Sequence, residues 1–110
     1  MANTFKNKGT ASIGSSYTTV YTCPSSTTST VIGMTVANKT GSNITVNVRV
    51  SDQSAGGDYF IVVNAPVLVG GSLVVVGGDQ KIVLEASDYV QVYSSAGASA
   101  DVFVSVLEQT

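Results

Sequence analysis

Carboxylates are the side chains of this sequence most able to do chemistry, because it contains no histidine and a single cysteine. Paired carboxylates can act as general acid and base, and the sequence offers Asp52 with Asp58 and Glu85 with Asp88. Each pair flanks a predicted turn, where such groups cap backbone donors or face water. Asp79 is a further oxygen donor for a calcium ion, but the spacing of an EF-hand is absent. We therefore expect no catalytic residue, no metal site and no cofactor.

The cysteine and the glycine pairs offer no stronger alternative. Without a histidine partner, Cys23 is expected to be a small apolar strand residue rather than a nucleophile. The glycines at 70–71 and 77–78 bracket a predicted strand, whereas a phosphate-binding loop needs a strand before it and a helix after it. The sequence therefore indicates a protein that is not an enzyme.

The composition restricts the classes of partner. Charged residues make up 11% of the 110 residues, against about 25% in an average globular protein. The net charge is −2 and the lysines and arginine form no run, which argues against nucleic acid as a partner. No apolar run approaches the length that spans a membrane. A surface with few charges is poorly protected against self-association. We therefore expect copies of the chain or another protein to cover part of it. A monomer with a Ser/Thr-rich coat is the alternative.

The stretch Val31–Val50 is the clearest structural element. Its second half alternates aliphatic and polar residues from Ile44 onward, which is the period of a strand with one buried face. Its first half alternates in the same way, with Ile32, Met34 and Val36 on one side. A short glycine-containing segment, 39–43, joins the halves, and we predict a central β-hairpin.

Further short runs with strand character are separated by turn residues. They lie at 17–23, 59–63, 67–69, 73–76, 81–85, 89–93 and 101–108. Residues 59–63 are apolar on both faces, so we expect that strand to be covered on both sides. The sequence predicts an all-β fold, a single antiparallel jelly-roll-like β-sandwich of eight or nine short strands over residues 17–110. Residues 1–16 are predicted to be an N-terminal arm, either frayed or anchored on a neighbouring subunit.

Four residues are the candidates for a subunit interface. Phe5 is the large apolar group of the arm, and Arg49 on the polar side of its strand is a candidate for an ion pair between subunits. Tyr89 and Tyr93 share one face of a strand whose other face carries valines. These tyrosines either cover a second apolar layer of the sandwich or lie in a subunit contact, where tyrosine is favoured.

Much of the chain also follows a known pattern of strand and turn motifs. The motifs are Thr19–Pro24, Thr30–Asn38, Ile44–Val46, Asn64–Pro66, Leu73–Val76, Lys81–Asp88 and Val104–Glu108. Over residues 17–108 the chain resembles small virion structural proteins of tailed bacteriophages, notably marine and cyanobacterial phages. It departs from that pattern at Ser87, where glycine is common, and at Cys23, where an aliphatic residue is usual.

The resemblance implies a capsid decoration (cement) protein that binds and stabilises the shell of major capsid protein. Such proteins are commonly trimers, so it also implies a homotrimer located in the virion and assembled in the host cytoplasm. Two alternatives remain open. One is a structural protein of the tail, the neck or a fibre attachment. The other is a β-sandwich module that binds a host glycan through exposed tyrosines.

Overall fold

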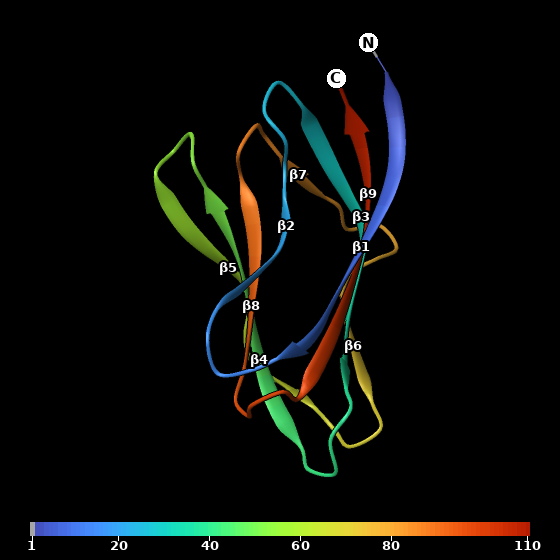
Figure 1. Cartoon of the computed structure of the whole chain (residues 1–110), viewed down its shortest axis with the longest axis vertical. Helices are drawn as coiled ribbons and strands as arrows, with labels where there is room; N and C mark the ends of the chain where they lie inside the picture. The colour runs from blue at the N-terminus through green and yellow to red at the C-terminus, as the bar shows by residue number, and fades with distance from the viewer. Residues whose placement is uncertain (1) are drawn as a thin grey trace.

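The described residues form nine antiparallel strands in two facing sheets (Figure 1), and several of these strands alternate valine with polar residues. The structure is a computed structural model and describes residues 2–110. The strands are β1 (Asn3–Ile13), β2 (Thr18–Thr22), β3 (Thr28–Asn38), β4 (Ile44–Asp52), β5 (Gly57–Val67), β6 (Ser72–Val76), β7 (Ile82–Leu84), β8 (Tyr89–Ser94) and β9 (Ala100–Gln109). In the part of the chain described, no helix is long and apolar enough to cross a membrane.

The strand order is that of a jelly roll. One sheet has the order β1-β9-β3-β6, with β7 also paired to β3, and the other has the order β2-β8-β4-β5. The chain thus behaves as one long hairpin that has been rolled up, because β4 pairs with β5, β3 with β6 and β7, β2 with β8, and β1 with β9. The predicted antiparallel β-sandwich is confirmed.

The core between the sheets consists mainly of valine, which is stiff about χ1 and suits a pleated surface. The inward positions predicted from alternation are confirmed over most of three strands, where the buried residues are Ile44, Val46, Val48, Val90, Val92, Val102, Val104 and Val106. The alternation breaks at the end of β4, where Val50 is only partly buried and Ser51 is buried. Cys23 is also buried among these apolar groups, at the end of β2. Since every second residue of these strands points inward, the intervening residues form the two outer faces of the molecule.

The predicted central hairpin is wrong, because β3 and β4 belong to different sheets. The segment between them crosses from one sheet to the other, and Asn38 organises this crossing. Its amide nitrogen donates to the carbonyl oxygens of Ser42 (2.8 Å) and Val67 (3.0 Å), and its side-chain oxygen accepts from the N–H of Thr40. The hairpin at this point of the fold is instead β4–β5. Alternation alone does not distinguish a hairpin from a crossing between sheets, since both bury one face of each strand.

Two further strand predictions differ from the structure. In β3 the register shifts between Val31 and Gly33, so Val31 is buried and Ile32 is only half-buried. β5 is not covered on both sides. It lies at the edge of its sheet, and Tyr59, Phe60 and other large side chains of this part of the chain stay in solvent. Its apolar composition therefore reflects an exposed edge rather than a double cover.

The predicted N-terminal arm is also different in the structure. Residues 3–13 form β1, an edge strand of the first sheet that pairs with β9 along its length. Hence no boundary between an arm and the sandwich exists at residue 16. The polar sequence concealed the strand because its side chains stay exposed on both faces, with only Ile13 buried.

Candidate functional site

The outer face of the β2-β8-β4-β5 sheet carries a network of side chains that contact one another, and we name it the networked face. It consists of Tyr17, Asn47, Arg49, Phe60, Gln91 and Tyr93. The guanidinium carbon of Arg49 lies 3.7 Å from the centroid of the Tyr17 ring, and Arg49 Nε donates to Gln91 Oε1 at 2.9 Å. The Tyr17 ring also packs against Tyr93 (5.4 Å between centroids) and Phe60 (6.4 Å). Cation–π and aromatic contacts of this kind stabilise the sheet that carries them.

Strand register explains why these residues meet. Arg49 of β4 lies directly opposite Gln91 of β8 on one side and Phe60 of β5 on the other. Tyr93 lies opposite Asn47, whose amide nitrogen is 3.2 Å from the hydroxyl of Tyr17. Residues directly opposite in an antiparallel pair point to the same side, so three strands present their side chains together. Asp58 lies 3.8 Å from Arg49 at the edge of the group.

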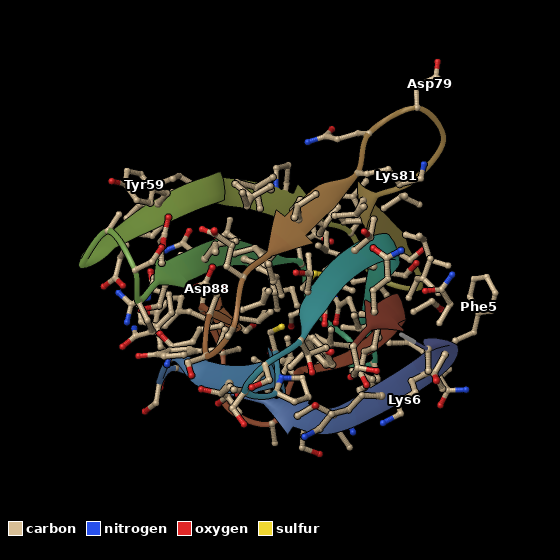
Figure 2. All side chains as sticks on the ribbon, turned by 90° about the horizontal axis from the view of Figure 1, so that it is seen from above. Phe5, Lys6, Tyr59, Asp79, Lys81 and Asp88 are labelled. Carbon is tan, nitrogen blue, oxygen red and sulfur yellow. The ribbon has the colours of Figure 1, made fainter. Side chains whose placement is uncertain are left out.

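The outer face of the other sheet is built differently, and we name it the neutral face. It carries two lateral rows of mutually opposite residues. One row is Gly9, Phe103, Thr35 and Val74, and the other is Phe5, Leu107, Thr30 and Val83. The exposed fractions are 73% for Phe5, 64% for Val74, 62% for Val83 and 53% for Phe103. Figure 2 shows Phe5 projecting away from the body of the molecule beyond β1, on the side opposite Tyr59.

Charge is nearly absent from the neutral face. Of the described strand residues that point outward from this sheet, Asp101 alone is charged, and its carboxylate is paired with the Lys39 ammonium at 2.8 Å at one end of the face. A hollow of about 340 Å³ lies beside Phe103, where Gly9, Thr35 and Ala37 have small side chains. Exposed apolar residues gathered on one uncharged face are typical of surfaces that another protein covers.

A buried polar group fastens the strands of the neutral face from beneath. The Tyr21 hydroxyl donates to the Glu108 carboxylate and also lies 2.8 Å from the hydroxyl of Ser29, while Lys6 pairs with Glu108 at 3.0 Å. The Tyr21 hydrogen bond, and then Lys6, hold the pKa of Glu108 below its ordinary value. Burial, and then the hydrogen bond to Glu108, raise the pKa of Tyr21. Side chains of four strands, β1, β2, β3 and β9, are thus joined through the Glu108 carboxylate and the Tyr21 hydroxyl.

The candidate acidic residues are partly brought together. Carboxylate oxygens of Asp52, Glu85 and Asp88 lie within 4.8 Å of one another, whereas Asp58 points to Arg49 instead. Both oxygens of Asp88 accept backbone N–H groups at 2.9 Å, one from Gln53 and one from Glu85. These hydrogen bonds tie the β4–β5 turn to the loop before β8, which is the turn-capping role expected from the sequence.

The four predicted interface residues do not converge on one surface. Arg49 and Tyr93 both belong to the networked face and meet through Tyr17, while Tyr89 lies at the other end of β8, opposite Ser51. Phe5 lies on the neutral face. Their role in an interface stays a prediction. Sequence reasoning missed Phe103, although an aromatic residue between two inward valines was a usable signal.

Comparison with known proteins gives a likeness in fold. No family model matches the chain, and no curated protein matches it. Among solved structures the chain is similar to one from work described as "Bacillus endospore appendages form a novel family of disulfide-linked pili". The TM-score is 0.51 at 16% sequence identity, over 100% of this chain and 91% of that one. Similarity at this level of identity establishes a shared fold and nothing about activity.

Proposed function

We propose that this protein is a non-enzymatic structural protein of a bacteriophage particle, a decoration (cement) protein that binds the shell of major capsid protein. The neutral face carries the proposal, because it combines exposed apolar side chains with an almost complete lack of charge. The resemblance of the motifs to small phage virion proteins supports a bacteriophage as the particle. The fold likeness to an appendage protein agrees with a structural role.

The neutral face would bind by burial of apolar surface. Each of Phe5, Val74, Val83 and Phe103 is more than half exposed in the free chain. Covering such a side chain contributes roughly 1 kcal/mol, so one copy gains a few kcal/mol of gross attraction. Repetition over many copies of a shell converts this modest attraction into resistance to rupture. Because the face lacks charge, its binding is expected to change little with salt.

The test is a reconstitution on stripped particles. Wild-type protein added back is expected to raise the temperature at which the capsids rupture, and a Phe103→Ser variant is expected to bind less and protect less. Phe60→Ser on the networked face is the matched control, because Phe60 and Phe103 are equally exposed (51% and 53%). An unchanged rupture temperature with bound wild-type protein would count against cementing.

A second candidate is a subunit of a surface appendage, and the fold likeness over almost all of both chains favours it. Disulfide linkage is not carried over, because the thiol of Cys23 is buried and hydrogen-bonded to the carbonyl oxygen of Thr27. Labelling the protein in electron micrographs separates the possibilities, since label on the head supports decoration and label on the tail, the neck or a filament supports the alternatives.

Glycan binding has weaker support. Tyr17 and Tyr93 pack on each other, and Arg49 covers the Tyr17 ring, which leaves less aromatic surface for a sugar. A glycan array without binding would remove this alternative.

A further inference from the structure

Strand β1 consists of two parts that are held in different ways. Ile13 is buried, its carbonyl oxygen accepts the N–H of Ser99 at 2.9 Å, and the carbonyl oxygen of Gly14 accepts the N–H of Ser94 at 2.9 Å. Residues 3–11, which we name the arm segment, have no buried side chain and rest on β9 through strand pairing. The anchor at residues 13–14 therefore belongs to the core, whereas the arm segment depends on main-chain hydrogen bonds and on the Lys6–Glu108 ion pair.

A strained joint separates the two parts. The register of β1 on β9 shifts between Thr10 and Ile13, and Ser12 has a φ of 60°. A left-handed conformation costs a residue with a side chain about 1–2 kcal/mol. Asp101 and Lys39 hold the joint closed, since the N–H of Ser12 donates to Asp101 at 3.0 Å and Lys39 donates to the Ser12 hydroxyl at 2.9 Å. Opening the joint to an extended backbone would release this strain, and strained hinges favour exchange between copies.

Charge indicates what the arm segment fits. Lys6 pairs with Glu108 of β9, so a β9 edge that has lost its own arm presents a carboxylate in need of a cation. Pairing of two β1 strands at their free edges would not place a cation beside Glu108 of β9. Centred on Asn7, such an antiparallel pair would set Lys6 of one copy opposite Lys8 of the other, and like charges directly opposite are destabilising. The charges therefore favour β9 over another β1 as the partner of the arm segment.

We propose that the arm segment exchanges between copies, leaving its own β9 by opening at Ser12 and pairing with β9 of a second copy of this chain. The exchanged contact repeats the strand pairing of the arm segment and the Lys6–Glu108 pair of the closed form, but it gives up the two hydrogen bonds of Ser12. Any extra stability of the exchanged form therefore comes from release of the backbone strain at Ser12. Loss of independent motion opposes exchange in dilute solution, and high local concentration on a particle favours it. The proposal does not depend on the proposed function, since it concerns contacts between copies and not the partner of the neutral face.

The test uses cysteines placed at a register pair. Asn7 of the arm segment and Ser105 of β9 are direct partners, and cysteines at paired positions of neighbouring strands come within disulfide range. One chain carries Asn7→Cys with an affinity tag, and the other carries Ser105→Cys. After coexpression and mild oxidation, exchange predicts a covalent heterodimer on a non-reducing gel. The matched control replaces the second chain by Ser54→Cys, an exposed position in the β4–β5 turn that is not paired with the arm segment.

Two further variants keep the test decisive. A chain with both Asn7→Cys and Ser105→Cys must lose its reactive thiols on oxidation, which shows that the pair can close. Ser12→Gly removes the strain of the joint and is expected to lower the yield of heterodimer several-fold. If the double variant closes entirely within one chain and the mixed chains give no more heterodimer than the Ser54→Cys control, the exchange proposal is wrong. That result would not affect the proposal that the neutral face is a docking surface, because capsid binding is measured in a separate experiment.

Discussion

The two outer faces of the sandwich have the same strand geometry but opposite chemistry. On the networked face, Arg49, Tyr17 and Gln91 direct their polar and aromatic groups to one another. On the neutral face, Phe5 and Phe103 direct theirs to solvent. Exposure alone does not separate the faces, since Phe60 and Phe103 are exposed to the same degree. What differs is whether the side chains already have partners within the chain.

This difference indicates where each face contributes. Contacts within the networked face stabilise the folded monomer, so substitutions there should lower its free energy of unfolding. The exposed side chains of the neutral face make few contacts within the monomer. Substitutions there should therefore affect association rather than the free energy of unfolding. The following predictions test this division, beginning with the largest expected effect.

Replacing Tyr17 by alanine should give the largest loss of stability on either face. The substitution removes the ring beneath Arg49, the contacts with Tyr93 and Phe60, and the hydrogen bond with Asn47. We expect a loss of about 2–3 kcal/mol in the free energy of unfolding, measured by urea denaturation. Phe103→Ser on the neutral face is the control and should change the same quantity by less than about 0.5 kcal/mol. Equal losses for the two variants would refute the division between the faces.

Acid should weaken the strands behind the neutral face through Glu108. Its pKa lies below the ordinary value in the folded protein because Tyr21 and Lys6 stabilise the charged form. The stabilisation is therefore complete above the ordinary pKa and is lost as the pH falls through the folded pKa. Glu108→Gln should cost about 1.5 kcal/mol near neutral pH, and the difference from wild type should shrink on acidification.

The comparison with Glu108→Gln is needed because other carboxylates respond with the same sign. Hydrogen bonds from Ser54 and Ala55 lower the pKa of Asp52, and those from Lys39 and Ser12 lower the pKa of Asp101. Both groups remain in the variant, so they contribute equally to the two curves. A wild-type-minus-variant difference that stays constant from neutral to acidic pH would contradict the role given to Glu108.

Replacing Arg49 by lysine should have a smaller effect of about 1 kcal/mol. Lysine keeps the positive charge but lacks the flat guanidinium that stacks on Tyr17 and the Nε donor that binds Gln91. The measurement is again urea denaturation, with Lys81→Arg as a control at an exposed loop position. An unchanged midpoint for Arg49→Lys would show that charge alone, rather than stacking, matters at this position.

Removing the ion pair at the end of the neutral face should have the smallest effect. Lys39 and Asp101 are both well exposed, so Lys39→Met should change the free energy of unfolding by less than about 1 kcal/mol. The effect should fade with added salt, because exposed pairs are screened. At 1 M salt the screening length is about 3 Å, so the contribution of an exposed ion pair should be small. A larger loss of unfolding free energy that persists at this salt concentration would contradict the assignment of Lys39–Asp101 as an exposed surface pair.

The sequence predicted the sandwich well where strands are regular. In β4, β8 and β9, strict alternation placed Val46, Val90 and Val104 correctly in the core. It failed where a strand contains an irregularity, as at Ile32, or where a strand carries no apolar stripe, as in β1. It also mistook the β3–β4 crossing for a hairpin, because the hydrogen bonds of Asn38 to Ser42 and Val67 depend on a strand distant in sequence.

The candidate site was predictable only in part. Tyrosines and Arg49 stood out by residue type, but their meeting at Tyr17 depends on the pairing of β4 with β8 and β5. The neutral face is a property of lateral rows that cross four strands, so it becomes visible only when the register is known. Phe103 illustrates the point, since its row partners Gly9, Thr35 and Val74 come from three separate parts of the chain.

The most direct test of the neutral face is side-chain footprinting on assembled particles. Hydroxyl radicals label exposed aromatic rings, and the free protein provides matched reporters, with Phe5 and Phe103 on the neutral face and Tyr59 and Phe60 on β5, all more than half exposed. In the particle, we predict that labelling of Phe5 and Phe103 falls sharply while Tyr59 and Phe60 remain as reactive as in the free protein. Protection of Tyr59 and Phe60 with unchanged labelling of Phe5 and Phe103 would contradict the account.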